Sequence, residues 1–230
     1  MQNLELIGLI VISWLLIWWY EKGNLSVLGL APTGKRLQSA GLLFLITALC
    51  CATGFLLRMY FVQEQFVLNP GANLALILTG IWLNFKSVLF EELLCRGVGL
   101  YVLIQKLGQK WAILISAFIF GLLHVLNPEA LSHPVQGLMT LGSTFIMGLL
   151  LAYAFARSKS LYLPFAIHFG WNLTQNFIFP DGPFGNQLLI SAAQPEVTVS
   201  YFVYFVMILF PKVSAIGLDY WMLTKMDGKG

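Results

Sequence analysis

Charged residues are scarce in this chain of 230 residues: Asp, Glu, Lys and Arg make up only 10% of it, whereas 58% is hydrophobic. A typical soluble domain carries about 25% charged residues. A chain with so few polar side chains cannot cover a water-facing surface, so the composition excludes a soluble globule. It predicts a single integral membrane domain over residues 1–230. The net charge of +3 is small and dispersed, which argues against a nucleic-acid partner.

Cysteine is also rare, and the features of a cleaved leader are missing. The three cysteines, Cys50, Cys51 and Cys95, lie in apolar stretches, and the adjacent pair would point to different faces of a helix. No disulfide framework is therefore expected. The N-terminus lacks a basic segment and a small-residue cleavage site, and its apolar run ends in a Trp-Trp-Tyr belt at residues 18–20. We expect a retained first span.

Long apolar runs, by contrast, are abundant, and they predict an all-α fold: a polytopic bundle of transmembrane helices. Seven spans are expected, with six or eight as alternatives. The third is long enough to be tilted, kinked or broken, and Pro211-Lys212 could kink the last one or end it early. The expected spans are about 4–20, 37–60, 72–104, 111–126, 135–156, 161–179 and 198–223.

Basic residues are missing from every second connection between these spans. Lys and Arg occur at 21–36, 105–110, 157–160 and in the C-terminal tail, but not at 1–3, 61–71, 127–134 or 180–197. By the positive-inside rule, this alternation predicts an N-terminus outside the membrane and a C-terminus in the cytoplasm. The compact length indicates a prokaryotic plasma membrane.

Two adjacent carboxylates, Glu91 and Glu92, interrupt the third run, and Arg96 follows them. Glu92 and Arg96 are four residues apart and share a helix face, so they can form an ion pair. Glu91 is rotated by about 100° and can point into a cavity. Carboxylates at membrane depth are expensive and usually functional. The alternative is a structural salt bridge that holds two helices together.

Two histidines form further polar pairs with helical spacing. Phe120 lies one turn before His124, and His168 lies one turn before Asn172. A neutral imidazole can bind a metal, transfer a proton or stabilise an oxyanion. The alternatives are a core histidine bonded to a carbonyl for His124, and hydrogen bonding between helices for His168 and Asn172.

The expected orientation gives a depth for each of these groups. At about 1.5 Å per residue, Glu91 and His124 lie roughly 20 Å from the cytoplasmic ends of their spans, and His168 lies about 10–12 Å from its own. The three side chains are therefore expected to share one pocket.

Together these residues resemble the motifs of the CPBP family, the CAAX-processing and bacteriocin-processing (Abi) intramembrane proteases. Its E-E-x-x-x-R motif is matched by Glu91, Glu92 and Arg96, its F-x-x-x-H motif by Phe120 and His124, and its H-x-x-x-N motif by His168 and Asn172. The resemblance implies an intramembrane endopeptidase with a catalytic core over about residues 80–178. The implied partners are the lipid bilayer and a membrane-anchored or prenylated peptide or protein substrate.

The chemistry of peptide hydrolysis suggests how these groups divide the work. Glu91 activates water, His124 orients it, and His168 and Asn172 polarise the scissile carbonyl. Glu92 either assists Glu91 directly or supports it through Arg96. In a metal-dependent version Glu91, His124 and His168 bind a divalent ion such as zinc; in the other version no cofactor is needed.

Other protease motifs are missing: the chain has no H-E-x-x-H, G-x-S-G or G-x-G-D. Two non-proteolytic functions stay open, a membrane scaffold or chaperone on the same fold and a proton-coupled transporter. Polar groups gathered at one depth would favour the protease, and a polar trail across the bilayer would favour transport. The sequence does not identify the substrate, which could be a prenylated tail, a bacteriocin leader or a signalling peptide.

Overall fold

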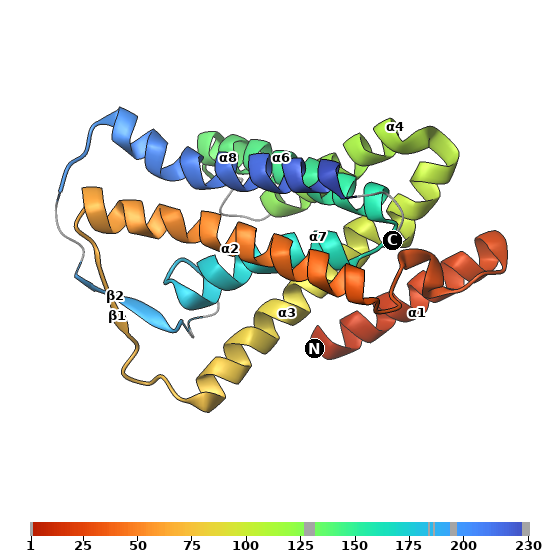
Figure 1. The fold of residues 1–230 in the computed structure, drawn as a ribbon, viewed down its shortest axis with the longest axis horizontal. Coiled ribbons are helices and arrows are strands. Elements are labelled where there is room, and N and C mark those ends of the chain that lie inside the picture. Colours follow the sequence, from red (N-terminus) through yellow and green to blue (C-terminus); the bar gives the residue numbers. More distant parts are fainter. Residues whose placement is uncertain (1, 127–131, 184, 186, 194–196, 227–230) are drawn as a thin grey trace. The chain divides into compact units, whose positions relative to one another are not determined.

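The computed structural model describes residues 2–126, 132–183, 185, 187–193 and 197–226, and it is almost entirely helical (Figure 1). The interpretation of the chain as a helical membrane bundle is consistent with this architecture. The described elements are α1 (Gln2–Glu21), η1 (Leu25–Leu28), α2 (Gly34–Phe61), β1 (Gln65–Leu68), α3 (Leu74–Arg96), α4 (Val98–Val125), α6 (Pro134–Ser158), α7 (Tyr162–Leu173), the π-helical segment η2 (Thr174–Ile178), β2 (Leu189–Ala193) and α8 (Tyr201–Lys225).

The chain forms two compact units, and α2, α3, α7 and α8 each contribute to both. The first unit comprises Met1–Ala40, Leu89–Phe165 and Leu223–Gly230, and the second comprises Gly41–Val88 and Ala166–Met222. Each unit is described by itself below. The prediction of one membrane domain with a core at residues 80–178 stays a prediction.

The first unit is built around an aliphatic core at which α1, η1, α4 and α6 meet. Helices α4 and α6 approach closely because small residues face each other: the position that a Cβ of Gly148 would take is 3.0 Å from Ala117 Cα. Small residues are the usual means of close helix packing in membranes. The buried residues of this core are Ile17, Leu28, Leu93, Val98, Leu100, Ala112, Ala152, Phe155 and Leu161.

The region expected to be a long third span is broken into two helices. Helix α3 ends at Arg96, Gly97 intervenes, and α4 begins at Val98 and continues through the expected loop at 105–110. The chain turns within α4 at Gly108, where φ is 77°. Glycine adopts this left-handed conformation without steric cost. Two helical segments thus meet at Gly108, inside the connection predicted at 105–110.

The second unit contains a short antiparallel ribbon of β1 and β2, which the sequence analysis placed in two loops (Figure 1). Phe66 pairs with Ser191 and Leu68 with Leu189, and a bulge lies between Gln65 and Phe66. The strands are only four and five residues long, and their partners are far apart in sequence. Local periodicity alone could not distinguish them from extended loops.

Helix α8 runs without interruption from Tyr201 to Lys225, so Pro211 neither ends it nor divides it. The proline ring packs against Gly54 of α2, where an added Cβ would lie 3.0 Å from Pro211 Cγ. Because Gly54 has no side chain, it leaves room for the proline ring between α2 and α8.

Four of the described helices are long and apolar enough to cross a membrane: Leu4–Glu21, Gly34–Phe61, Pro134–Ser158 and Tyr201–Lys225. Many large apolar side chains on these helices are exposed, among them Trp19, Leu49 and Phe202. Such surfaces suit contact with lipid rather than water. The chain is an integral membrane protein of helical type, while the expected seven spans and the orientation of the termini stay predictions.

Candidate active site

The first motif forms a buried ion pair at the end of α3. Arg96 Nη1 donates to Glu92 Oε1 at 3.0 Å, and both side chains are fully buried. The pair predicted from the spacing of four residues is thus confirmed. Arg96 Nε and Nη2 have no hydrogen-bond partner among the described residues, and the guanidinium lies over the ring of Phe120 at 4.0 Å. A cation above an aromatic face is electrostatically favourable, so Arg96 connects the first motif to the second.

The second motif fixes the orientation of His124 within α4. The rings of Phe120 and His124 are 4.4 Å apart, and His124 Nδ1 lies 2.8 Å from the carbonyl oxygen of Phe120. A carbonyl can only accept, so Nδ1 carries the proton, and Nε2 of the neutral imidazole carries a lone pair. The carbonyl contact is the one expected for a structural core histidine, and it involves Nδ1 and not Nε2.

Glu91 and His124 face each other across a short gap. Glu91 Oε2 is 3.7 Å from His124 Nε2, and the two side chains are 28% and 34% exposed. The separation exceeds a direct hydrogen bond and suits one bridging atom held by both groups. The two carboxylates therefore differ in their surroundings: Glu92 is fully enclosed with Arg96, whereas the Glu91 side chain is partly exposed although its Oε2 atom is buried.

The helices that carry these groups are held together locally. Ser116 Oγ of α4 donates to the carbonyl oxygen of Cys95, one residue before Arg96, at 2.8 Å. This bond fixes the last turn of α3 against α4. Glu91 lies on α3 and His124 lies on α4, so this hydrogen bond connects the two helices that carry them.

The third motif forms a pair on α7, in the second unit. Asn172 Nδ2 lies 3.2 Å from His168 Nε2, and His168 is almost fully buried. If the amide donates, His168 Nε2 accepts and Nδ1 carries the proton.

Close packing and a local hydrogen bond position α7. Gly170 approaches the carbonyl oxygen of Phe44 in α2 so closely that an added Cβ would lie 2.6 Å from it. Trp171 Nε1 donates to Gln175 Oε1 at 2.7 Å. Glu91 and His124 belong to the first unit and His168 and Asn172 to the second, so the predicted common pocket stays a prediction.

Of the three predicted metal ligands, Glu91 and His124 belong to the first unit and His168 belongs to the second. Glu91 Oε2 and His124 Nε2 provide two suitable donor atoms, but His168 Nε2 already lies beside Asn172 Nδ2. In the part of the chain that the structure describes, no group of three or more His, Cys, Asp or Glu side chains could hold a metal ion. The predicted three-ligand set draws on both units, so it stays a prediction.

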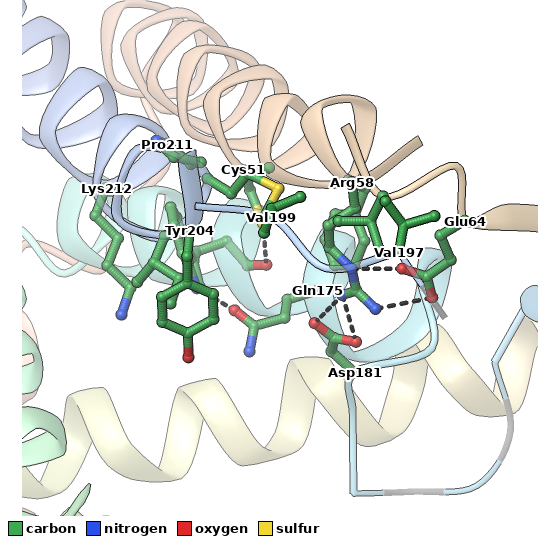
Figure 2. Close-up of a pocket in the computed structure, with 16 residues that line it drawn as sticks. Cys51, Arg58, Glu64, Gln175, Asp181, Val197, Val199, Tyr204, Pro211 and Lys212 are labelled. Carbon is green, nitrogen blue, oxygen red and sulfur yellow. Dashed lines mark hydrogen bonds and ion pairs between the residues drawn. The ribbon is translucent and has the colours of Figure 1, made fainter. Parts of the chain in front are cut away.

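Several buried polar groups escaped the sequence analysis. Asp219 of α8 is fully buried and bonds to Thr47 of α2 at 2.6 Å. Arg58 binds Glu64 and Asp181 beside a pocket of about 550 Å³ in the second unit (Figure 2). A lone charge in an apolar run was the available signal for Asp219 and Arg58. The ion pairs of Arg58 could be found only from the tertiary structure, because its partners lie in segments expected to be loops.

One of the comparisons with known proteins finds a family that resembles part of this chain. Residues 72–174 match the sequence model described as type II CAAX prenyl endopeptidase Rce1-like. The match contains all the motif residues from Glu91 to Asn172, and it confirms the resemblance to the CAAX-processing family.

The matched region thus resembles the Rce1-like family, whose description is that of type II CAAX prenyl endopeptidases. No curated protein and no solved structure shows a significant match to the chain.

Proposed function

We propose that this chain is an intramembrane endopeptidase that hydrolyses a peptide bond of a membrane-associated or lipidated substrate, with a water molecule activated by Glu91. The observation that carries the proposal is the pair of Glu91 Oε2 and His124 Nε2, 3.7 Å apart. Both atoms accept hydrogen bonds, since His124 keeps its proton on the Nδ1 that faces the Phe120 carbonyl. A carboxylate and an imidazole lone pair therefore converge on one position.

Two acceptors at one position orient a water molecule for attack. One O–H of the water points to Glu91 and the other to His124, so an oxygen lone pair is left for the scissile carbonyl carbon. Glu91 takes the proton as the C–O bond forms, and the carbonyl oxygen becomes an oxyanion. The protonated Glu91 then gives the proton to the leaving amine as the C–N bond breaks.

The buried residues Arg96, Glu92 and Phe120 support this chemistry without touching the substrate. Arg96 neutralises Glu92 and stacks on Phe120, whose backbone carbonyl holds the imidazole. Glu92 thus acts through Arg96 and not on the substrate. The positive charge also balances one of two adjacent carboxylates, which leaves Glu91 as the reacting group.

His168 and Asn172 supply the stabilisation of the oxyanion in this proposal. The support is the resemblance of their motif together with their contact of 3.2 Å. An imidazole and an amide both carry N–H groups, the kind of donor that stabilises a developing negative charge. The substrate class follows from the description of the family, so a prenylated, membrane-bound peptide is the first substrate to test.

The test compares the full chain with its Glu91→Gln variant in lipid nanodiscs on a membrane-anchored, prenylated peptide, with products identified by mass spectrometry. Removing the general base should lower the rate of cleavage by about 100-fold or more. Glu5→Gln is the matched control, because Glu5 is an exposed carboxylate of α1. A folded Glu91→Gln variant that cleaves at the wild-type rate would refute the proposal.

A further inference from the structure

None of the motif residues lines the pocket in the second unit. Its two cationic side chains, Arg58 and Lys212, differ in whether a carboxylate is paired with them. Its volume of about 550 Å³ lies within the range of small-molecule sites. It is bounded by α2, α7 with η2, α8 and the chain segments beside β1 and β2. Figure 2 shows its two charged regions, with Arg58 at one end and Lys212 at the other.

The charge of Arg58 is already compensated. Its guanidinium binds Glu64 at 2.6 Å and Asp181 at 2.7 Å. Two carboxylates around one cation leave a net charge of −1 at this end of the pocket. An anionic ligand would be repelled there, so this end does not attract one.

The charge of Lys212 is not compensated in the same way. Lys212 lies near the middle of α8, a helix long and apolar enough to cross the membrane. The described residues provide it with no ion pair and no hydrogen bond. An ammonium group at such a position is expensive and normally faces a counter-ion or a functional cavity. Here it lines the pocket.

Two neutral donors accompany Lys212. Gln175 uses its Oε1 to accept from Trp171 and thereby presents its amide nitrogen to the pocket. Tyr204 contributes a hydroxyl group. In Figure 2 the lysine nitrogen, the tyrosine hydroxyl and the glutamine amide nitrogen all lie on the same side of the pocket. One cation with two neutral donors matches a single carboxylate.

The rest of the pocket wall is apolar, which indicates that the rest of the ligand is apolar as well. Phe55 of α2 and Met207, Ile208 and Pro211 of α8 give the wall its apolar character. We propose that this pocket binds an apolar chain that ends in a carboxylate, with the carboxylate held at Lys212. Such a chain could come from a free fatty acid of the bilayer or from the C-terminus of a hydrophobic peptide, and the test separates the two sources. The inference does not rest on the proposed protease function.

The experiment uses the full chain in nanodiscs of zwitterionic lipid and a photoreactive palmitate analogue as the probe. Mass spectrometry should locate cross-links on pocket residues such as Met207. Palmitate should suppress them and hexadecanol should not. Lys212→Met should weaken labelling by about tenfold, as expected for the loss of a charge-assisted hydrogen bond, whereas Lys212→Arg should retain it. Lys225→Met, at the end of the same helix and outside the pocket, is the matched control.

The outcomes are distinct. Labelling that is equal in wild type and Lys212→Met, or that hexadecanol suppresses as well as palmitate does, would overturn the proposal, because the probe would then report lipid contact alone. If palmitate does not bind, a hydrophobic peptide with a free carboxylate is compared with its amide. Binding of the acid form alone would support the site with a peptide as its source, and binding of neither form would overturn it. If Lys212→Met does not fold, the comparison of palmitate with hexadecanol on wild type decides.

Discussion

Arg96 is a buried cation that contacts both a carboxylate and an aromatic ring. It is fully enclosed, pairs with Glu92 at 3.0 Å and lies over Phe120 at 4.0 Å. The local part of this arrangement follows from helical spacing, since residues four apart share a face. The contact with Phe120 could not be inferred in that way, because it joins two helices.

The first prediction concerns this buried pair. Arg96→Met should destabilise the protein by about 3–5 kcal/mol, because it leaves the Glu92 carboxylate buried without its partner. The double variant Glu92→Leu with Arg96→Met should recover most of that loss, since an apolar pair of similar size is often as stable as an ion pair. Thermal unfolding in detergent measures both, with the exposed Lys110→Met as the control for a lost positive charge.

A double variant that is as unstable as Arg96→Met alone would contradict this account. Cleavage gives a second readout. Because Arg96 neutralises Glu92 and contacts Phe120, the stable double variant should still lose activity.

At the scale of the elements, packing of α7 against α2 depends on a single missing side chain. Gly170→Ala would place a methyl group 2.6 Å from the carbonyl oxygen of Phe44. The helices must then separate, and the expected loss of stability is about 1–3 kcal/mol, as for other overpacked sites. Since His168 and Asn172 belong to α7, cleavage should fall as well.

The matched control is Gly142→Ala in α6, where an added Cβ meets nothing within 4 Å. That change should be neutral or stabilise the helix by up to about 1 kcal/mol. Thermal unfolding of the Gly170→Ala and Gly142→Ala variants measures the difference in stability between them. Equal stabilities for the two alanine variants would show that the approach of α2 and α7 is not tight.

Elements differ in how far the sequence predicts them. Apolar runs long enough to cross a membrane predict α1, α2, α6 and α8, because each run carries its own signal. The ribbon of β1 and β2 was missed, since its pairing joins residues 65–68 to residues 189–193. The turn at Gly108 lies inside the connection predicted at 105–110, because a glycine in a polar stretch is a local signal for a break between helices.

At the scale of the whole molecule, the distribution of basic residues predicts an N-terminus and a C-terminus on opposite sides of the membrane. Single cysteines at Lys35→Cys and Ala192→Cys, in a background without Cys50, Cys51 and Cys95, should react with a membrane-impermeant maleimide from opposite sides. Both native side chains are exposed. Position 35 should react only from the cytoplasmic side. Labelling of both positions from one side would contradict the predicted orientation.

The last prediction concerns metal dependence. Protein purified without metal and treated with a strong chelator should cleave the prenylated peptide as fast as untreated protein, because the proposed water is held by Glu91 and His124 alone. A zinc protease treated in parallel should lose its activity, which shows that the chelator works. Loss of activity that added zinc restores would instead support the metal-dependent version predicted from the sequence.

The sequence by itself determined the class of this protein. Its apolar runs define a membrane protein, and the spacing of Glu91, Glu92 and Arg96 and of the two histidine motifs indicates the family, because helical periodicity and charge at membrane depth are local properties. The tertiary structure decided which groups meet. It set Arg96 on Phe120, turned His124 Nε2 toward Glu91 and left Lys212 in a pocket of its own, because contacts between helices depend on packing that no local pattern encodes.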